Sequence, residues 1–101
     1  MKIQTQYLNP GRRDHMKIEV MYFGRPSEYL QVTSERIKVD DDMLSLNEVL
    51  NKLRNRNSRW AYELDDSHVI CTVNRKSALL TDAIEDGDEI DIFSMKSIFE
   101  L

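Results

Sequence analysis

The sequence predicts a single α+β domain, in which a mixed sheet of four or five strands packs one face against one main helix. Segments in which apolar and polar residues alternate, the period of a strand with one buried face, lie on both sides of one segment with helical spacing. The 101 residues, of which 41% are hydrophobic, suit one modest core and leave no room for a second domain.

The domain is expected to span residues 16–101. Residues 1–15 are polar, lack periodicity and contain the breaker Asn9-Pro10-Gly11. Because nothing in this stretch offsets the entropy of ordering it, we expect a disordered extension there. Either an upstream start or a leader added by an expression vector would explain it.

The first two strands are predicted in KIEVMYF (residues 17–23) and SERIKV (residues 34–39). In the first, the alternating apolar positions define one buried face, and the strand stops at Gly24-Arg25-Pro26. Residues 27–30 fit either one helical turn or a wide loop. We expect the two strands to pair antiparallel.

The strongest helix signal in the chain follows the aspartates at positions 40–42. Ser45 can cap the helix, with Glu48 completing a capping box, while Leu44 and Val49 form a hydrophobic staple. The apolar residues that share one face at helical spacing are Leu46, Val49, Leu50 and Leu53. The helix is predicted from about Leu46 to Arg56 and should cover the sheet.

Three more strands complete the sheet, namely HVICTVN (residues 68–74), SALL (residues 77–80) and EIDIFSM (residues 89–95). The tetrad at residues 85–88 predicts a tight turn, in which Gly87 takes a positive φ at little cost. The order strand, strand, helix, strand, strand, strand is that of the ubiquitin-like β-grasp. In that arrangement the first and last strands lie side by side and parallel in the middle of the sheet, with the helix covering the crossover.

Two side chains outside this pattern have both a structural and a functional interpretation. Trp60 follows the helix and is expected to close the edge of the core, with a hot spot for a partner as the alternative. His68 lies at a strand edge, and we interpret it as a surface residue because no second histidine or cysteine is placed to complete a metal site with it.

Charge and hydropathy exclude several classes of function. The formal net charge is −4, and the 14 basic and 18 acidic residues are mixed along the chain, so no basic stripe for nucleic acid is present. No run approaches the roughly 18 apolar residues of a membrane span. Because the N-terminus also lacks a hydrophobic signal region, we expect a cytoplasmic protein without a membrane partner.

The sequence offers little for catalysis or for a cofactor. Cys71, the single cysteine, lies in an apolar run, which excludes an internal disulfide and a cysteine metal cluster and suits a reducing compartment. The three aspartates before the helix are interpreted as turn residues favoured by the helix dipole. No pair of nucleophile and base and no phosphate-binding glycine loop is found, so we predict no catalytic residue, no metal site and no cofactor.

Four segments resemble the small subunit of molybdopterin synthase, and the resemblance extends over residues 16 to about 95. They read KIEVMYFG (residues 17–24), RWAYELDD (59–66), VICTVN (69–74) and LLTDAIEDGDEIDIF (79–93). Within β-grasp proteins, the VN pair and the DGDEI turn indicate the sulfur-carrier branch, which also includes the thiamine-pathway carrier and the ubiquitin-related modifiers. The Arg59-Trp60 pair before an acidic loop favours the molybdopterin member.

The resemblance implies a protein that works with partners. Members of this family end in a flexible tail that closes with Gly-Gly. An activating enzyme adenylates the terminal carboxylate, sulfur replaces the adenylate, and the thiocarboxylate is delivered inside the large subunit of the synthase. Glycines suit this task because the terminal carboxylate must come close to the α-phosphate of ATP. Side chains at the end of the tail would obstruct that close approach of the backbone.

This sequence departs from that pattern, because residues 94–101 read SMKSIFEL and no glycine follows Gly87. We therefore expect a protein that acts in, or derives from, molybdenum cofactor biosynthesis by docking on a partner, without thiocarboxylate chemistry at this tail. The expected partner is the large subunit of the synthase or an activating enzyme. Two alternatives stay open: a genuine sulfur carrier whose glycine tail lies outside this sequence, and a stand-alone adaptor or self-associating β-grasp protein.

Alternation along the strands predicts an apolar patch on the face of the sheet opposite the helix. A small soluble domain seldom leaves such an area open, so the patch indicates a partner surface or a place where the tail folds back. The apolar residues of the tail could anchor it in cis or in trans; the alternatives for the tail are self-association and a plain extension of the last strand. The predicted partner-binding residues are Met21, Phe23, Ile70, Phe93, Met95, Ile98, Phe99 and Leu101.

Overall fold

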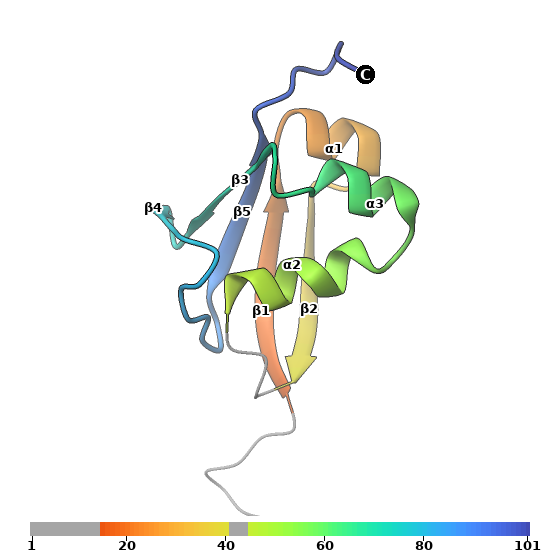
Figure 1. Ribbon diagram of the computed structural model, residues 1–101. Helices are drawn as coiled ribbons and strands as arrows, with labels where there is room; N and C mark the ends of the chain where they lie inside the picture. The colour runs from red at the N-terminus through yellow and green to blue at the C-terminus, as the bar shows by residue number, and fades with distance from the viewer. Residues whose placement is uncertain (1–14, 41–44) are drawn as a thin grey trace, which may run out of the picture.

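The computed structural model of the protein describes residues 15–40 and 45–101, and it confirms the α+β class (Figure 1). A five-stranded sheet is combined with one longer and two shorter helices in this part of the chain. In chain order the elements are β1 (His15–Tyr22), α1 (Arg25–Leu30), β2 (Ser34–Asp40), α2 (Leu46–Arg54), α3 (Ser58–Glu63), β3 (Val69–Val73), β4 (Lys76–Ser77) and β5 (Glu89–Ser94).

The sheet has the strand order β2-β1-β5-β3-β4. The first and last strands, β1 and β5, pair parallel at its centre, as predicted, with Val20 opposite Ile90 and Tyr22 opposite Ile92 (Figure 1). The expected antiparallel pairing of β1 with β2 is also confirmed. β5 therefore joins the β1–β2 hairpin to the antiparallel β3–β4 hairpin.

The helix α2 begins with the predicted capping box. The Ser45 hydroxyl accepts a hydrogen bond from the Glu48 N–H at 3.2 Å, and the Glu48 carboxylate accepts one from the Ser45 N–H at 3.0 Å. The helix ends at Arg54, two residues earlier than predicted. Leu44 of the predicted staple and the predicted extension at residues 1–14 lie outside the described residues. His15 is the first residue of β1, one position before the predicted start of the domain.

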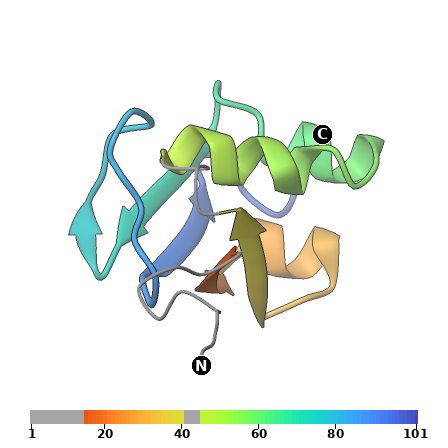
Figure 2. The ribbon, with the colours of Figure 1, turned by 90° about the horizontal axis from the view of Figure 1, so that it is seen from below.

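The core lies between α2 and one face of the sheet (Figure 2). Alternate residues of the strands point into it, as the sequence patterns predicted, and the predicted face of α2 covers them. The buried apolar residues are Met16, Ile18, Val20, Tyr22, Ile37, Val39, Leu46, Val49, Leu50, Leu53, Leu64, Ile84, Ile90 and Ile92. Among the helices of the described residues, none is long and apolar enough to cross a membrane.

Two elements differ from the prediction. The helix α3 was not predicted, although Asn57 caps it by accepting a hydrogen bond from the Trp60 N–H at 3.0 Å. The short strand predicted at residues 77–80 is wrong in extent, because pairing with β3 covers only Lys76–Ser77. The Leu79 N–H donates instead to the Asp82 carboxylate at 2.8 Å, so the chain leaves the ladder there.

Trp60 packs against the edge of the core, and His68 is buried. The Trp60 ring packs against the core, edge-on to Tyr22 at 5.6 Å between centroids, and the Arg56 guanidinium lies 4.5 Å from its centroid. This confirms the structural interpretation of Trp60. The surface interpretation of His68 is wrong: its side chain is buried, and its Nε2 lies 2.7 Å from the Tyr62 carbonyl oxygen. A hydrogen bond to that carbonyl makes burial of a histidine inexpensive.

Candidate functional site

The face of the sheet turned away from α2, here called the outer face, carries the predicted apolar residues of the strands. The rings of Phe23 and Phe93 stack with their centroids 4.9 Å apart and their planes at 13°. Ile70 is the cross-strand partner of Phe93, and Phe23 and Ile70 keep 40% and 41% of their surfaces exposed. We call Met21, Phe23, Ile70, Phe93 and Met95 the outer patch. The structure thus brings the aromatic pair and Ile70 together on neighbouring strands.

Apolar surface continues around the edge of β3 into an open cleft of about 360 Å³. Its lining includes Ile70 and Met95 of the outer patch together with Leu46 and Cys71. Burial raises the pKa of the Cys71 thiol to about 12, so the thiol stays protonated at neutral pH and is a poor nucleophile. Within residues 15–40 and 45–101, no group of three or more potential ligands is arranged to hold a metal ion.

The predicted residues Ile98, Phe99 and Leu101 lie in the C-terminal tail that follows β5. Their hydrogen bonds to the rest of the domain go to helix residues: the Tyr29 hydroxyl donates to the Ile98 carbonyl, and the Tyr62 hydroxyl donates to the Leu101 carbonyl at 2.9 Å. The side chains of Phe99 and Leu101 are 93% and 99% exposed. The tail is therefore held through its backbone at the end of the sheet, while Phe99 and Leu101 are exposed to solvent and Ile98 is partly covered.

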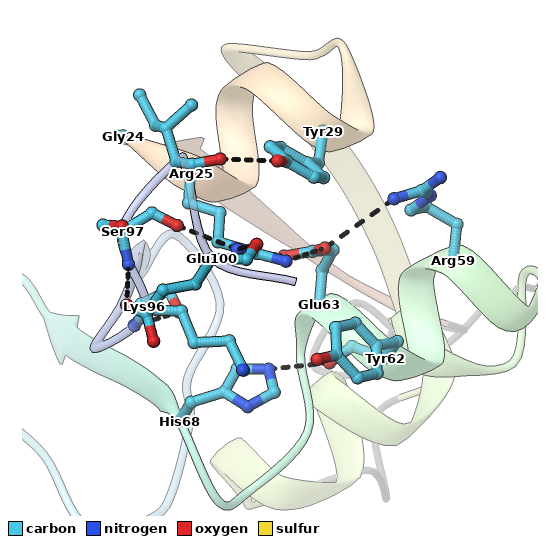
Figure 3. A network of polar contacts seen from close by, with 12 residues as sticks. Gly24, Arg25, Tyr29, Arg59, Tyr62, Glu63, His68, Lys96, Ser97 and Glu100 are labelled. Carbon is cyan, nitrogen blue, oxygen red and sulfur yellow. Dashed lines mark hydrogen bonds and ion pairs between the residues drawn. The ribbon is translucent and has the colours of Figure 1, made fainter.

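Arg25 is the centre of the contacts that hold the tail (Figure 3). Its Nε donates to Glu63 Oε1 at 2.8 Å and its Nη2 donates to Glu63 Oε2 at 3.1 Å, and both side chains are buried. Its Nη1 donates to the carbonyls of Ser97, at 2.8 Å, and Glu100. The hydrogen bonds to Glu63 raise the pKa of Arg25, so the guanidinium stays charged. We call Arg25, Tyr29, Tyr62 and Glu63 the tail clamp.

The ends of two short helices place the tail clamp. Arg25 is the first residue of α1, directly after Gly24 with its φ of 61°, and the ring of Tyr29, one turn later, lies 4.3 Å from the Arg25 guanidinium carbon. Glu63 is the last residue of α3. Sequence reasoning missed the tail clamp: Arg25 was interpreted only as part of a breaker, and no periodicity connects it with a residue 38 positions away.

The tail itself forms a compact turn. The Ser97 N–H donates to the Glu100 carboxylate at 2.6 Å, and this hydrogen bond lowers the pKa of Glu100. The Lys96 ammonium donates to the Leu101 carbonyl at 2.9 Å. These bonds and those of the tail clamp hold residues 97–101 against the domain.

Comparison with known proteins shows the family of the chain. A family model described as the ThiS family matches residues 20–96. The molybdopterin synthase sulfur carrier subunit of Haemophilus influenzae is 26% identical over 76 residues, which are 75% of this chain and 91% of that protein. This relative agrees with the resemblance found in the sequence.

Solved structures confirm the predicted ubiquitin-like β-grasp fold. The solution structure of the Haloferax volcanii HVO 2177 protein matches with a TM-score of 0.70 at 22% identity, over 95% of this chain and 98% of that one. The crystal structure of SAMP1 from Haloferax volcanii matches with a TM-score of 0.67 at 23% identity, over 80% of this chain and 97% of that one. At these identities the likeness concerns the fold alone.

Proposed function

Because the chain belongs to the ThiS family of small ubiquitin-like sulfur-carrier proteins, we propose that it acts by docking on a protein partner through its outer patch, in or derived from molybdenum cofactor biosynthesis. The carrier subunit of Haemophilus influenzae supports this proposal, because a subunit of a synthase works bound to another protein. The proposed partner is the large subunit of a molybdopterin synthase or an activating enzyme. The unpaired Cys71 suits the cytoplasm as the compartment.

The stacked Phe23–Phe93 pair is the observation that carries the proposal. Phe93 lies in β5, and Phe23 directly follows β1 and donates its backbone N–H to the Ile92 carbonyl at 2.9 Å. Both backbones are thus already fixed, so binding would cost little further conformational entropy. Burying one phenylalanine side chain contributes about 1.5–3 kcal/mol, and such anchors at the centre of an interface dominate its affinity. Exposed Ile70 beside the pair widens the area that a partner covers.

Replacing Phe23 with serine tests the docking proposal. We expect the variant to stay folded, because the side chain lies outside the core, and to bind the large subunit of a molybdopterin synthase about 30-fold or more weakly, as for a hot-spot residue. Isothermal titration calorimetry and gel filtration with the purified large subunit measure this. Leu79→Ser is the matched control, because Leu79 is an exposed apolar residue in the loop after β4 and does not belong to the outer patch. Equal affinity of Phe23→Ser and wild type, or no complex at tens of micromolar, contradicts the proposal.

A sulfur carrier in the strict sense is the second candidate, favoured by the function in the name of the Haemophilus influenzae relative. We propose that residues 94–101, which contain no glycine and are held by the tail clamp, do not perform this chemistry. Incubation of this chain with an activating enzyme, ATP and a sulfur donor, followed by intact mass spectrometry, should show neither an adenylate nor a gain of sulfur for oxygen. Either product would establish the carrier and exclude a function limited to docking.

A further inference from the structure

A buried carboxylate lies on the outer face beside the outer patch. Ile90 and Ile92 of β5 point into the core, so the alternation of the strand turns Asp91 to the outer face. Asp91 is opposite Met21 of β1 and Thr72 of β3. Although none of the described helices covers this face, Asp91 keeps only 6% of its surface exposed.

The hydrogen bonding of Asp91 is incomplete. The Thr72 hydroxyl donates to Asp91 Oδ2 at 3.3 Å, but Oδ1 is buried without any hydrogen-bond partner. A hydrogen bond between the carboxyl groups of Glu89 and Asp91 requires a proton and raises the pKa of Glu89. When both groups are ionised, no donor faces Oδ1. A buried carboxylate oxygen without a donor is unfavourable, and nearly all such groups in proteins have a partner.

The other carboxylates that β1 and β5 present on the outer face are compensated by cations. Glu19 and Glu89 are neighbours across these strands, one row from Asp91. Arg36 lies 2.7 Å from Glu19, and Arg75 lies 3.7 Å from Glu89. Of the three carboxylates that β1 and β5 present on the outer face, namely Glu19, Glu89 and Asp91, Asp91 is thus the one without an ion pair. On the other side of Asp91 along β5, the next outward-facing residue is Phe93, which is opposite Ile70 of β3, and both belong to the outer patch.

We propose that Asp91 receives an arginine or lysine side chain of the docking partner, which presents this cation among apolar side chains that cover the outer patch. The proposal rests on the proposed function for its use of the outer face, and it adds the chemistry of the partner. A guanidinium supplies hydrogen-bond donors for Oδ1 and keeps its charge at neutral pH. The aromatic stack excludes water, which strengthens the ion pair between this guanidinium and the Asp91 carboxylate. Asp91 therefore determines specificity, while Phe23 and Phe93 supply most of the buried apolar area.

The first experiment needs no pathway partner. The peptide acetyl-Leu-Arg-Phe-amide is titrated into the labelled protein at neutral pH, and its neutral analogue with citrulline in place of arginine serves as the control. Heteronuclear NMR should show amide shifts at Met21, Thr72 and Asp91 with the arginine peptide that are absent with the citrulline peptide. Equal shifts with both peptides, or none with either, overturn the inference.

The variant Asp91→Asn removes the charge and keeps the shape of the side chain. We expect it to melt at the same or a higher temperature than wild type, because an unpaired buried charge is removed, and to lose the arginine-specific shifts. Glu85→Gln is the matched control: it removes one charge from an exposed turn residue and should respond like wild type. An Asp91→Asn variant that responds like wild type overturns the inference.

The large synthase subunit separates this inference from the proposed function. Loss of one partner of a desolvated charge pair should weaken binding of Asp91→Asn about 30-fold or more. If Phe23→Ser loses affinity and Asp91→Asn does not, the docking function stands and the role of Asp91 is refuted. If the wild-type protein does not bind this subunit, the proposed function fails, and the peptide titration alone decides on Asp91.

Discussion

Arg25→Met should lower the free energy of unfolding by about 3–5 kcal/mol, the cost expected when one partner of a buried ion pair is removed. The substitution leaves the Glu63 carboxylate buried after losing hydrogen bonds of 2.8 and 3.1 Å. Arg59 does not replace them, because it is exposed and its Nη1 lies 4.0 Å from Glu63 Oε2. Urea denaturation followed by circular dichroism measures the loss.

The double variant Arg25→Met with Glu63→Leu provides the matched control. It removes the charge together with its partner, so most of the lost stability should return, as for other buried pairs replaced by apolar residues. The carbonyls of Ser97 and Glu100 still lose their donor in this variant. We therefore expect a stable domain whose tail is trimmed faster than wild type by a carboxypeptidase. A single Arg25→Met variant within 1 kcal/mol of wild type would contradict the assigned role of the pair.

Trp60→Ala should lower the free energy of unfolding by about 3 kcal/mol, near the lower end of the range for truncation of a large aromatic residue, because Trp60 is only partly buried. The substitution removes the edge-on contact with Tyr22 and the surface on which the Arg56 guanidinium lies. Thermal and urea denaturation of the purified variant measure the effect.

Phe99→Ala is the control for Trp60→Ala, because Phe99 is 93% exposed and its truncation should change stability by no more than about 0.5 kcal/mol. The two interpretations of Trp60 predict different results. A residue that closes the core destabilises the free domain when truncated. A residue that serves only as a partner hot spot leaves stability unchanged and weakens binding, and that result would contradict the packing described above.

The parts of the fold that could be predicted from sequence are those in which a pattern of apolar and polar residues, or a capping motif, extends over several residues. β1 and β5 alternate over enough positions to define a buried face, and the capping box fixes the start of α2 at Ser45. The motif residues of the family could be found for the same reason, because they lie in contiguous segments. The outer patch followed directly from alternation once the core face was known.

The remaining features depend on single contacts between distant residues. α3 has six residues, too few for a helical period to be distinguished, and Asn57 alone marks its start. The pairing of Arg25 with Glu63 depends on the packing of α1 against α3, and His68 is buried where it contacts Tyr62 of α3. Asp91 occupies a position that alternation assigns to solvent, and its burial results from neighbours on two other strands.

The central position of β5 between β1 and β3 has a consequence for synthesis on the ribosome. The β1–β2 hairpin can pair, and α2 can cover its inner face, while translation continues. The other edge of β1 gains its neighbour only when Glu89–Ser94 have left the exit tunnel. Until then the nascent chain exposes an unpaired strand edge, to which other chains can pair. Folding of this domain is therefore completed only after β5 has emerged, and chaperones that bind unfolded segments can act until then.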